Sequence, residues 1–178
     1  AARPAPANTG NVGGETRELG ELKSGRLKRL HAVWQARCGA RRWPSRADLR
    51  PEDFGFILGT VTLVDVLRDP LRFRMRLVGS QVEDVGRRGD QGKMLDDLKP
   101  KFYAAFLRPQ YTEAATAGVP LIHRVTFLGA SRPQLHPLSY ERVILPISSD
   151  GAAVDTLLIA SDWPRSIDGA LRKFHAEN

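Results

Sequence analysis

The chain has 178 residues, 42% hydrophobic and 26% charged, as is ordinary for one soluble globular domain. No apolar run approaches the roughly 20 residues of a membrane span, and the start lacks an apolar signal core. Cys38 is the only cysteine, which excludes an internal disulfide. We therefore expect a cytoplasmic protein that does not contact a membrane.

The net charge of +7 and the isoelectric point of about 10.1 raise the alternative of a basic nucleic-acid-binding protein that uses dispersed Arg and Lys. The arginines, however, are scattered along the expected strands, helices and turns. Dispersed arginine is typical of a solvated surface, so we expect nucleic acid to be an unlikely partner.

The N-terminal region has two parts. Residues 1–14 are rich in Ala, Pro, Gly and Asn and predict a disordered arm. Residues 15–40 predict an amphipathic helix, in which Ser24-Gly25 is the candidate position for a weakened or bent turn. Its apolar stripe can cap the sheet of its own chain, pair with a partner, or do both. The candidate partner residues are Leu19, Leu22, Leu30 and Trp34.

The rest of the chain predicts strands separated by a helical insertion. Residues 60–66 and 72–78 form a hairpin around Asp69-Pro70, residues 102–117 form a long helix, and residues 121–128, 139–147 and 154–161 form three further strands. The last of these strands is a nearly continuous apolar run, as expected for a central strand. A short helix or tail follows at residues 165–178. This order predicts an α+β fold with a five-stranded antiparallel sheet.

The segment after the second strand is punctuated by Gly86, Gly89 and Gly92. A phosphate-binding loop would require glycine where Arg87 stands. Turns with positive φ explain these glycines better.

Three segments together resemble the PAS-like domain family, in a bacterial single-domain subfamily with an N-terminal helix. They are Trp34 with residues 42–51, residues 73–79 with Gly92, and residues 140–146 with Asp150-Gly151. The resemblance places the PAS-like domain at residues 41–164, with helices on one face of the sheet. It implies a sensory or regulatory module in cytoplasmic signalling, commonly a homodimer, that binds a small ligand or a signalling protein. At this length the chain has no space for a separate output domain, so we expect output through partner contact.

The resemblance fixes no cofactor, because PAS domains hold haem, flavins, organic acids or nothing. The cysteine used in flavin photochemistry would follow the second strand, whereas Cys38 lies far upstream. The long helix carries no histidine for haem. His123 is a possible axial ligand, although a lone histidine on a strand is more often a packed or surface residue. The four histidines show no paired spacing for a metal.

A cavity between the sheet and the helices is the expected binding site. If the side chain of Arg76 faces inward, its charge needs Asp65, Glu83, Glu141 or a carboxylate ligand as partner. The apolar candidates could equally be ordinary core. The candidate ligand-binding residues are Arg76, Val85, Leu98, Phe102, Phe106, Tyr111, His123, Tyr140 and Arg142.

Catalytic patterns are absent from the sequence. Ser80 follows Gly79 without a Gly-x-Ser-x-Gly elbow, and Asp96-Asp97 suits the start of a helix. We therefore expect a protein that is not an enzyme.

Overall fold

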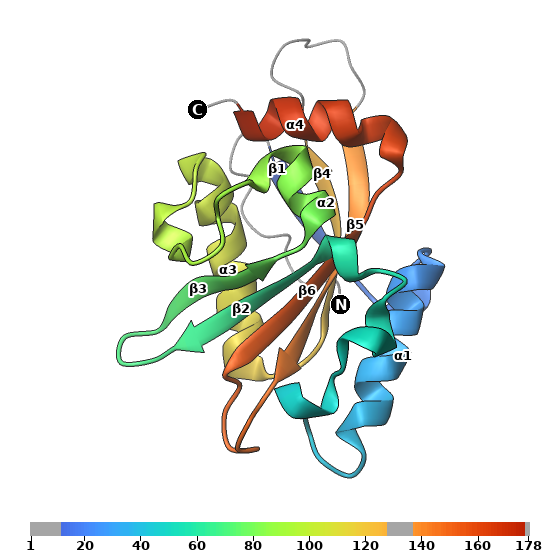
Figure 1. The fold of residues 1–178 in the computed structure, drawn as a ribbon, viewed down its shortest axis with the longest axis vertical. Helices are drawn as coiled ribbons and strands as arrows, with labels where there is room; N and C mark the ends of the chain where they lie inside the picture. Colours follow the sequence, from blue (N-terminus) through green and yellow to red (C-terminus); the bar gives the residue numbers. More distant parts are fainter. Residues whose placement is uncertain (1–11, 128–136, 177–178) are drawn as a thin grey trace.

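The computed structural model describes residues 12–127 and 137–176, and the strands of these residues form one open antiparallel sheet (Figure 1). The spatial order is β1-β4-β5-β6-β2-β3, which confirms the α+β class with six strands in place of five. The strands are β1 Val12–Arg17, β2 Val61–Leu67, β3 Arg72–Val78, β4 Leu121–Phe127, β5 Leu138–Ile147 and β6 Thr156–Asp162.

Strand β1 corrects the sequence-based reading of the N-terminal region. It pairs antiparallel with β4, from Val12 opposite Phe127 to Arg17 opposite Ile122. Residues 12–14 are therefore not part of a disordered arm, and residues 15–17 are not helical; residues 1–11 lie outside the described residues. This strand depends on a partner more than 100 residues away, which a local pattern cannot reveal.

The helices are α1 Gly25–Cys38, α2 Ser80–Val82, α3 Lys101–Ala117 and α4 Asp168–Ala176. Helix α2 continues into a π-helical turn, η5 Glu83–Arg87. Short 3₁₀ turns are η1 Leu19–Glu21, η2 Arg46–Asp48, η3 Pro51–Phe54, η4 Leu58–Thr60, η6 Leu95–Asp97 and η7 Arg165–Ile167.

Helix α1 starts ten residues later than the sequence predicts. The Ser24 hydroxyl caps it by accepting the main-chain N–H of Leu27 at 3.1 Å. The carboxylate of Glu141 on β5 accepts the main-chain N–H groups of Lys23 at 2.8 Å and Ser24 at 2.7 Å. Ser24 thus begins the helix instead of bending it.

Helices cover both faces of the central strands. Neighbouring β5 residues point to opposite faces, and Glu141 faces the start of α1 whereas Arg142 reaches Gln110 on α3. Helix α1 therefore lies across the sheet from the layer that contains α2, η5 and α3 (Figure 1). Strand β6 lies between β5 and β2 with Thr156 to Ala160 buried, which confirms a central position.

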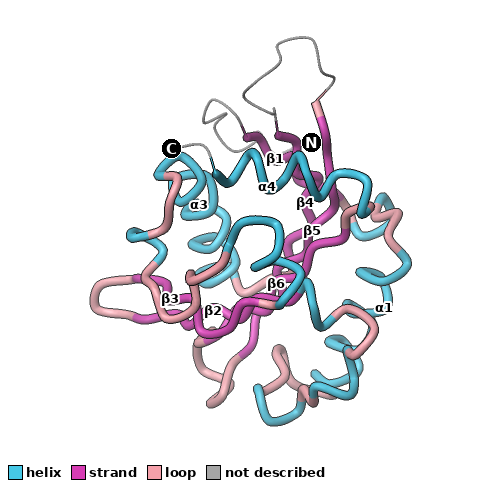
Figure 2. The backbone as a smooth tube through the Cα atoms, turned by 45° about the horizontal axis from the view of Figure 1, so that its top comes forward, coloured by secondary structure: helices cyan, strands magenta, loops and turns pink. Residues whose placement is uncertain are grey.

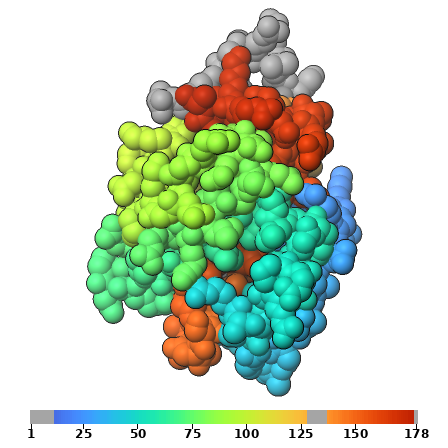
Figure 3. Space-filling model, in the orientation of Figure 1, coloured from blue at the N-terminus to red at the C-terminus, as the bar shows by residue number. Residues whose placement is uncertain are grey.

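Helix α4 crosses one end of the sheet, near β1 and β4 in two views (Figures 1 and 2). Its Phe174 ring lies 5.2 Å from Phe127 on β4 and 5.5 Å from Phe102 on α3, measured between ring centroids. On the surface, the red C-terminal helix lies directly against the green segment that includes η5 (Figure 3). The C-terminal segment is therefore an integral part of the helical layer.

The β2–β3 hairpin forms as expected and exposes its arginines. Phe73 and Met75 are buried, whereas Arg72, Arg74 and Arg76 are exposed. The register shifts opposite Leu63 and Val64, so that β3 has one extra residue and its alternation reverses after Arg76. As a result Leu77, which the simple alternation places with Phe73, is 37% exposed.

Candidate functional site

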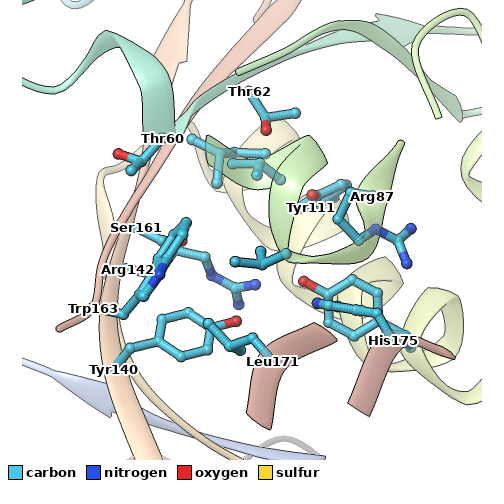
Figure 4. A pocket seen from close by; sticks show the side chains of 14 residues that line it. Thr60, Thr62, Arg87, Tyr111, Tyr140, Arg142, Ser161, Trp163, Leu171 and His175 are labelled. Atoms are coloured by element: carbon cyan, nitrogen blue, oxygen red, sulfur yellow. The ribbon is translucent and has the colours of Figure 1, made fainter. Parts of the chain in front are cut away.

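A cavity of about 60 Å³ lies between β5, β6 and the helical layer (Figure 4). Four apolar side chains contribute to its walls, namely Val82, Val85, Ile159 and Leu171. Its polar and aromatic lining consists of Thr60, Thr62, Arg87, Tyr103, Tyr111, Tyr140, Arg142, Ser161, Trp163 and His175. A second cavity of about 50 Å³ adjoins it, because Thr62, Val82, Arg87, Tyr103 and Tyr111 line both.

Arg142 is the buried cation of this cavity. It stands on β5 opposite His123 of β4 and Ser161 of β6, and only 2% of its surface is exposed. One terminal nitrogen, Nη2, donates to the side-chain oxygen of Gln110, and the guanidinium lies 5.4 Å from the Phe106 ring centroid. The Nε atom is buried without a hydrogen-bond partner in the described structure.

No ion pair among the described residues includes Arg142, and no Asp or Glu lines the 60 Å³ cavity. A buried charge without a counter-charge is costly, because the protein interior solvates it poorly. In Figure 4 the side chain extends into the middle of the cavity, and the Tyr140 hydroxyl points to the same space. The site thus presents a positive charge where a ligand would lie.

Arg87 differs, because its charge is already matched. Its Nη2 lies 2.6 Å from Oδ2 of Asp90, and its Nη1 donates to the main-chain oxygen of Lys99 at 2.7 Å. The guanidinium also lies 4.8 Å from the ring centroid of Tyr103. Burial raises the pKa of Asp90 more than the positive charges of Arg87 and Lys93 lower it. This ion pair joins η5 to the turn that follows it.

Burial sets the protonation of the other polar groups. It lowers the pKa of His123 to about 3, helped by the charge of Arg142, and lowers that of His175 to about 3, helped by Arg87. Burial also raises the pKa of Tyr111 and Tyr140 above the usual range. At neutral pH both imidazoles are uncharged and both phenols keep their protons, so the phenols can donate hydrogen bonds.

Gly86 allows α4 to close one side of the cavity. Its φ of +118° is one that L-residues rarely adopt, and a Cβ there would lie 2.6 Å from Cβ of His175. Glycine therefore permits η5 and α4 to approach closely. Positive φ values at Gly86, Gly89 and Gly92 confirm the turn interpretation of these glycines.

Four of the predicted ligand-binding residues line this cavity, namely Val85, Tyr111, Tyr140 and Arg142. Leu98 lines the adjoining cavity, and Phe106 packs beneath Arg142. Phe102 packs on Phe174 in the core. His123 is 2% exposed, and its Nδ1 has no hydrogen-bond partner in the described structure.

The prediction that Arg76 contributes to the pocket is wrong. Its Nε pairs with Oδ1 of Asp65 at 3.5 Å on the exposed face of the hairpin, where Arg74 binds the same carboxylate at 2.9 Å. An internal ion pair with Asp65 was one of the expected alternatives, and it is the one that the structure contains.

The predicted partner residues lie mostly in this chain's own core. Leu22 and Leu30 are each 1% exposed, and Trp34 donates from Nε1 to the main-chain oxygen of Pro146 at 2.8 Å. The apolar stripe of α1 therefore covers the sheet, and of these residues only Leu19 is exposed.

Sequence reasoning missed Arg87, Tyr103, Trp163 and His175. His175 belongs to the C-terminal segment at residues 165–178, which the sequence pattern predicted as a short helix or tail, whereas Trp163 directly follows β6. The spacing of Leu171 and Phe174 was the available signal, because an apolar stripe on this helix requires a surface to cover. Among the described residues, no cluster of three or more His, Cys, Asp or Glu side chains is placed to hold a metal ion.

A family model described as a PAS domain matches residues 22–159, which is more than half of the chain. Neither the curated proteins nor the solved structures contain a match. Within residues 12–127 and 137–176, no helix combines the length and the apolar character needed to cross a membrane.

Proposed function

Because the chain belongs to the PAS domain family, we propose that it is a non-enzymatic sensory or regulatory module of cytoplasmic signalling. In this proposal a small ligand occupies the cavity between the sheet and the helical layer, and the signal passes through contact with a protein partner. The observation that carries it is the buried side chain of Arg142, whose Nε lacks a hydrogen-bond partner within residues 12–127 and 137–176 and lies beside a cavity.

The size of the cavity limits the ligand. Sites for drug-sized molecules have volumes of about 300–1,000 Å³. The cavity of about 60 Å³ and its neighbour of about 50 Å³ are far smaller, so neither haem nor flavin fits without a large rearrangement. A small molecule is therefore the ligand that we propose.

A ligand in the cavity could change the position of α4. Leu171 and His175 of α4 line it together with Val85 and Arg87 of η5, so a bound molecule would contact both elements. Any change in their spacing on binding would alter the outer surface of α4, which a partner protein can read.

We also propose that the chain forms a homodimer. Leu63 of β2 and Leu77 of β3 are cross-strand neighbours, and Leu77 is 37% exposed. An exposed leucine beside a half-buried one on a sheet face suits an interface between identical subunits. Light scattering should therefore show a dimer that Leu77→Arg disrupts, whereas Leu19→Arg, at another exposed leucine, should leave it intact.

The nucleic-acid alternative receives little support. Many exposed arginines pair with acidic residues, including Arg37 with Asp53 at 2.8 Å and Arg41 with Asp48 at 2.7 Å. Interspersed acidic groups weaken the attraction of a surface for phosphates.

Native mass spectrometry of the purified chain tests ligand binding. We expect an additional mass of a small molecule that disappears when the protein is denatured, or uptake of such a molecule when metabolite pools are added. A chain that carries nothing and takes up nothing would contradict the sensory proposal.

A further inference from the structure

The two arginines of the cavity are in opposite electrostatic situations. Arg87 is paired with the buried carboxylate of Asp90, whereas the partners of Arg142 among the described residues are the neutral amide of Gln110 and the ring of Phe106. An arginine guanidinium binds carboxylates through two parallel N–H groups, and here its Nε is unused. The arrangement therefore lacks one negative charge.

The neighbouring groups suit an anion. Tyr111 and Tyr140 retain their protons and can donate hydrogen bonds, and Nδ1 of His175 is buried without a hydrogen-bond partner in the described structure. None of the described residues that line this cavity is Asp or Glu, so none of these side chains repels a negative charge. Hydrogen-bond donors around a positive charge form a site for an oxyanion.

The dimensions restrict the anion further. One water molecule needs about 10–15 Å³ on this measure of volume, so about 60 Å³ has space for roughly four waters, or for one molecule of about four or five heavy atoms. Val85, Ile159 and Leu171 provide an apolar wall for a methyl or short alkyl group. A carboxylate with a short apolar tail satisfies both parts of the lining.

We propose that the cavity binds a small monocarboxylate of the size of acetate or propionate, through the Arg142 guanidinium and the Tyr140 hydroxyl. The proposal rests on the sensory function above and names its ligand class. The bound carboxylate supplies the charge that Arg142 lacks, and its tail lies against Leu171 of α4. Occupancy of the cavity thereby stabilises α4 in its docked position.

Titration calorimetry with the full chain tests this proposal. Sodium acetate and sodium propionate are compared with acetamide, which has nearly the same shape as acetate without its charge, and with sodium chloride at equal ionic strength. We expect saturable binding of the carboxylates, and no saturable response to acetamide or chloride.

The variant Arg142→Gln should weaken carboxylate binding about tenfold or more, because a neutral amide replaces the charged donor. Arg76→Gln removes an exposed arginine of the same sheet and should bind as the unmodified chain does. Should Arg142→Gln fail to fold, Tyr140→Phe, which removes only one hydroxyl, should still reduce the affinity measurably.

Equal binding of acetamide and acetate would overturn the proposal, as would unchanged binding by both Arg142→Gln and Tyr140→Phe. Recovery of a neutral molecule from the purified protein, with no response to carboxylates, would also overturn it but would leave the sensory function intact. If the protein binds neither carboxylates nor neutral molecules, both the carboxylate proposal and the proposed sensory function are contradicted.

Discussion

Replacing Gly86 with Ala tests whether the cavity depends on the close approach of η5 and α4. An alanine at a φ of +118° is strained, and strain of this kind costs about 1–3 kcal/mol. Its Cβ would also lie 2.6 Å from Cβ of His175, where one of the two elements must move. We expect a total loss of about 2–4 kcal/mol in the free energy of unfolding.

Gly89→Ala is the matched control. Gly89 also has a positive φ, of +79°, but a Cβ there meets nothing within 4 Å. It should cost about 1–2 kcal/mol from backbone strain alone. Urea denaturation measures both losses, and hydrogen exchange measures the opening of α4. Amides of α4 should exchange about tenfold faster in Gly86→Ala than in Gly89→Ala, because the contact with His175 is displaced.

The double variant Gly86→Ala with His175→Gly separates the contact from the strain, since it removes the Cβ that clashes. A favourable coupling energy of about 1 kcal/mol or more in this double-mutant cycle is expected. Equal stability and equal α4 exchange in Gly86→Ala and Gly89→Ala would refute the argument that α4 depends on this glycine.

Three further predictions concern the core and the histidines. Leu22→Ala should destabilise the fold by about 2–5 kcal/mol in urea denaturation, whereas Leu19→Ala should change stability by less than about 0.5 kcal/mol, because only the first side chain is buried. Trp34→Phe should cost about 1–3 kcal/mol by the same assay, because it leaves a buried carbonyl without its donor. His123 and His175 bind protons below about pH 6.5 in the unfolded chain, but only below about pH 3 in the folded chain. The free energy of unfolding should therefore decrease as the pH falls across this range, by up to about 1.4 kcal/mol per pH unit for each histidine.

Each of these expectations has a contrary result. Similar losses for Leu22→Ala and Leu19→Ala would mean that the N-terminal segment packs differently. An unchanged unfolding midpoint in Trp34→Phe would show that the hydrogen bond from Trp34 to the main-chain oxygen of Pro146 does not stabilise the packing of α1 on the sheet. For the histidines, NMR titration that gives pKa values near 6.5 would contradict their burial.

The parts of the fold that depend on local pattern could be predicted. The apolar run that forms β6 indicated a strand covered on both faces, and the structure places it between β5 and β2. The alternation of Phe73 and Met75 with arginines predicted that the two sets lie on opposite faces of β3 as far as Arg76, but not which of the two faces is buried. Beyond that point the extra residue reverses the alternation, and a bulge has no clear signature in one sequence.

The parts that depend on distant partners could not be predicted. Val12–Arg17 contains two glycines and forms a strand because β4 offers an edge to pair with. The start of α1 is set by the Glu141 carboxylate, 117 residues after Ser24. Neither interaction can be recognised from the sequence of the segment itself.

The lining of the cavity could be predicted in part, on the sheet side and, through Val85 and Tyr111, on the helical side. The alternation of β5 singled out Tyr140 and Arg142, both of which line the cavity. The opposite wall comes from η5 and α4, which meet through the contact of Gly86 with His175. A contact between segments almost 90 residues apart cannot be inferred from either segment alone.

The most direct test of the account is to locate a small carboxylate by NMR, with methyl-labelled acetate and isotope-labelled protein. We expect intermolecular nuclear Overhauser contacts from the acetate methyl group to the side chains of Val85 and Leu171, with shifts at Nε of Arg142. Contacts confined to surface residues, or an Arg142 resonance that does not respond at saturating acetate, would contradict the account.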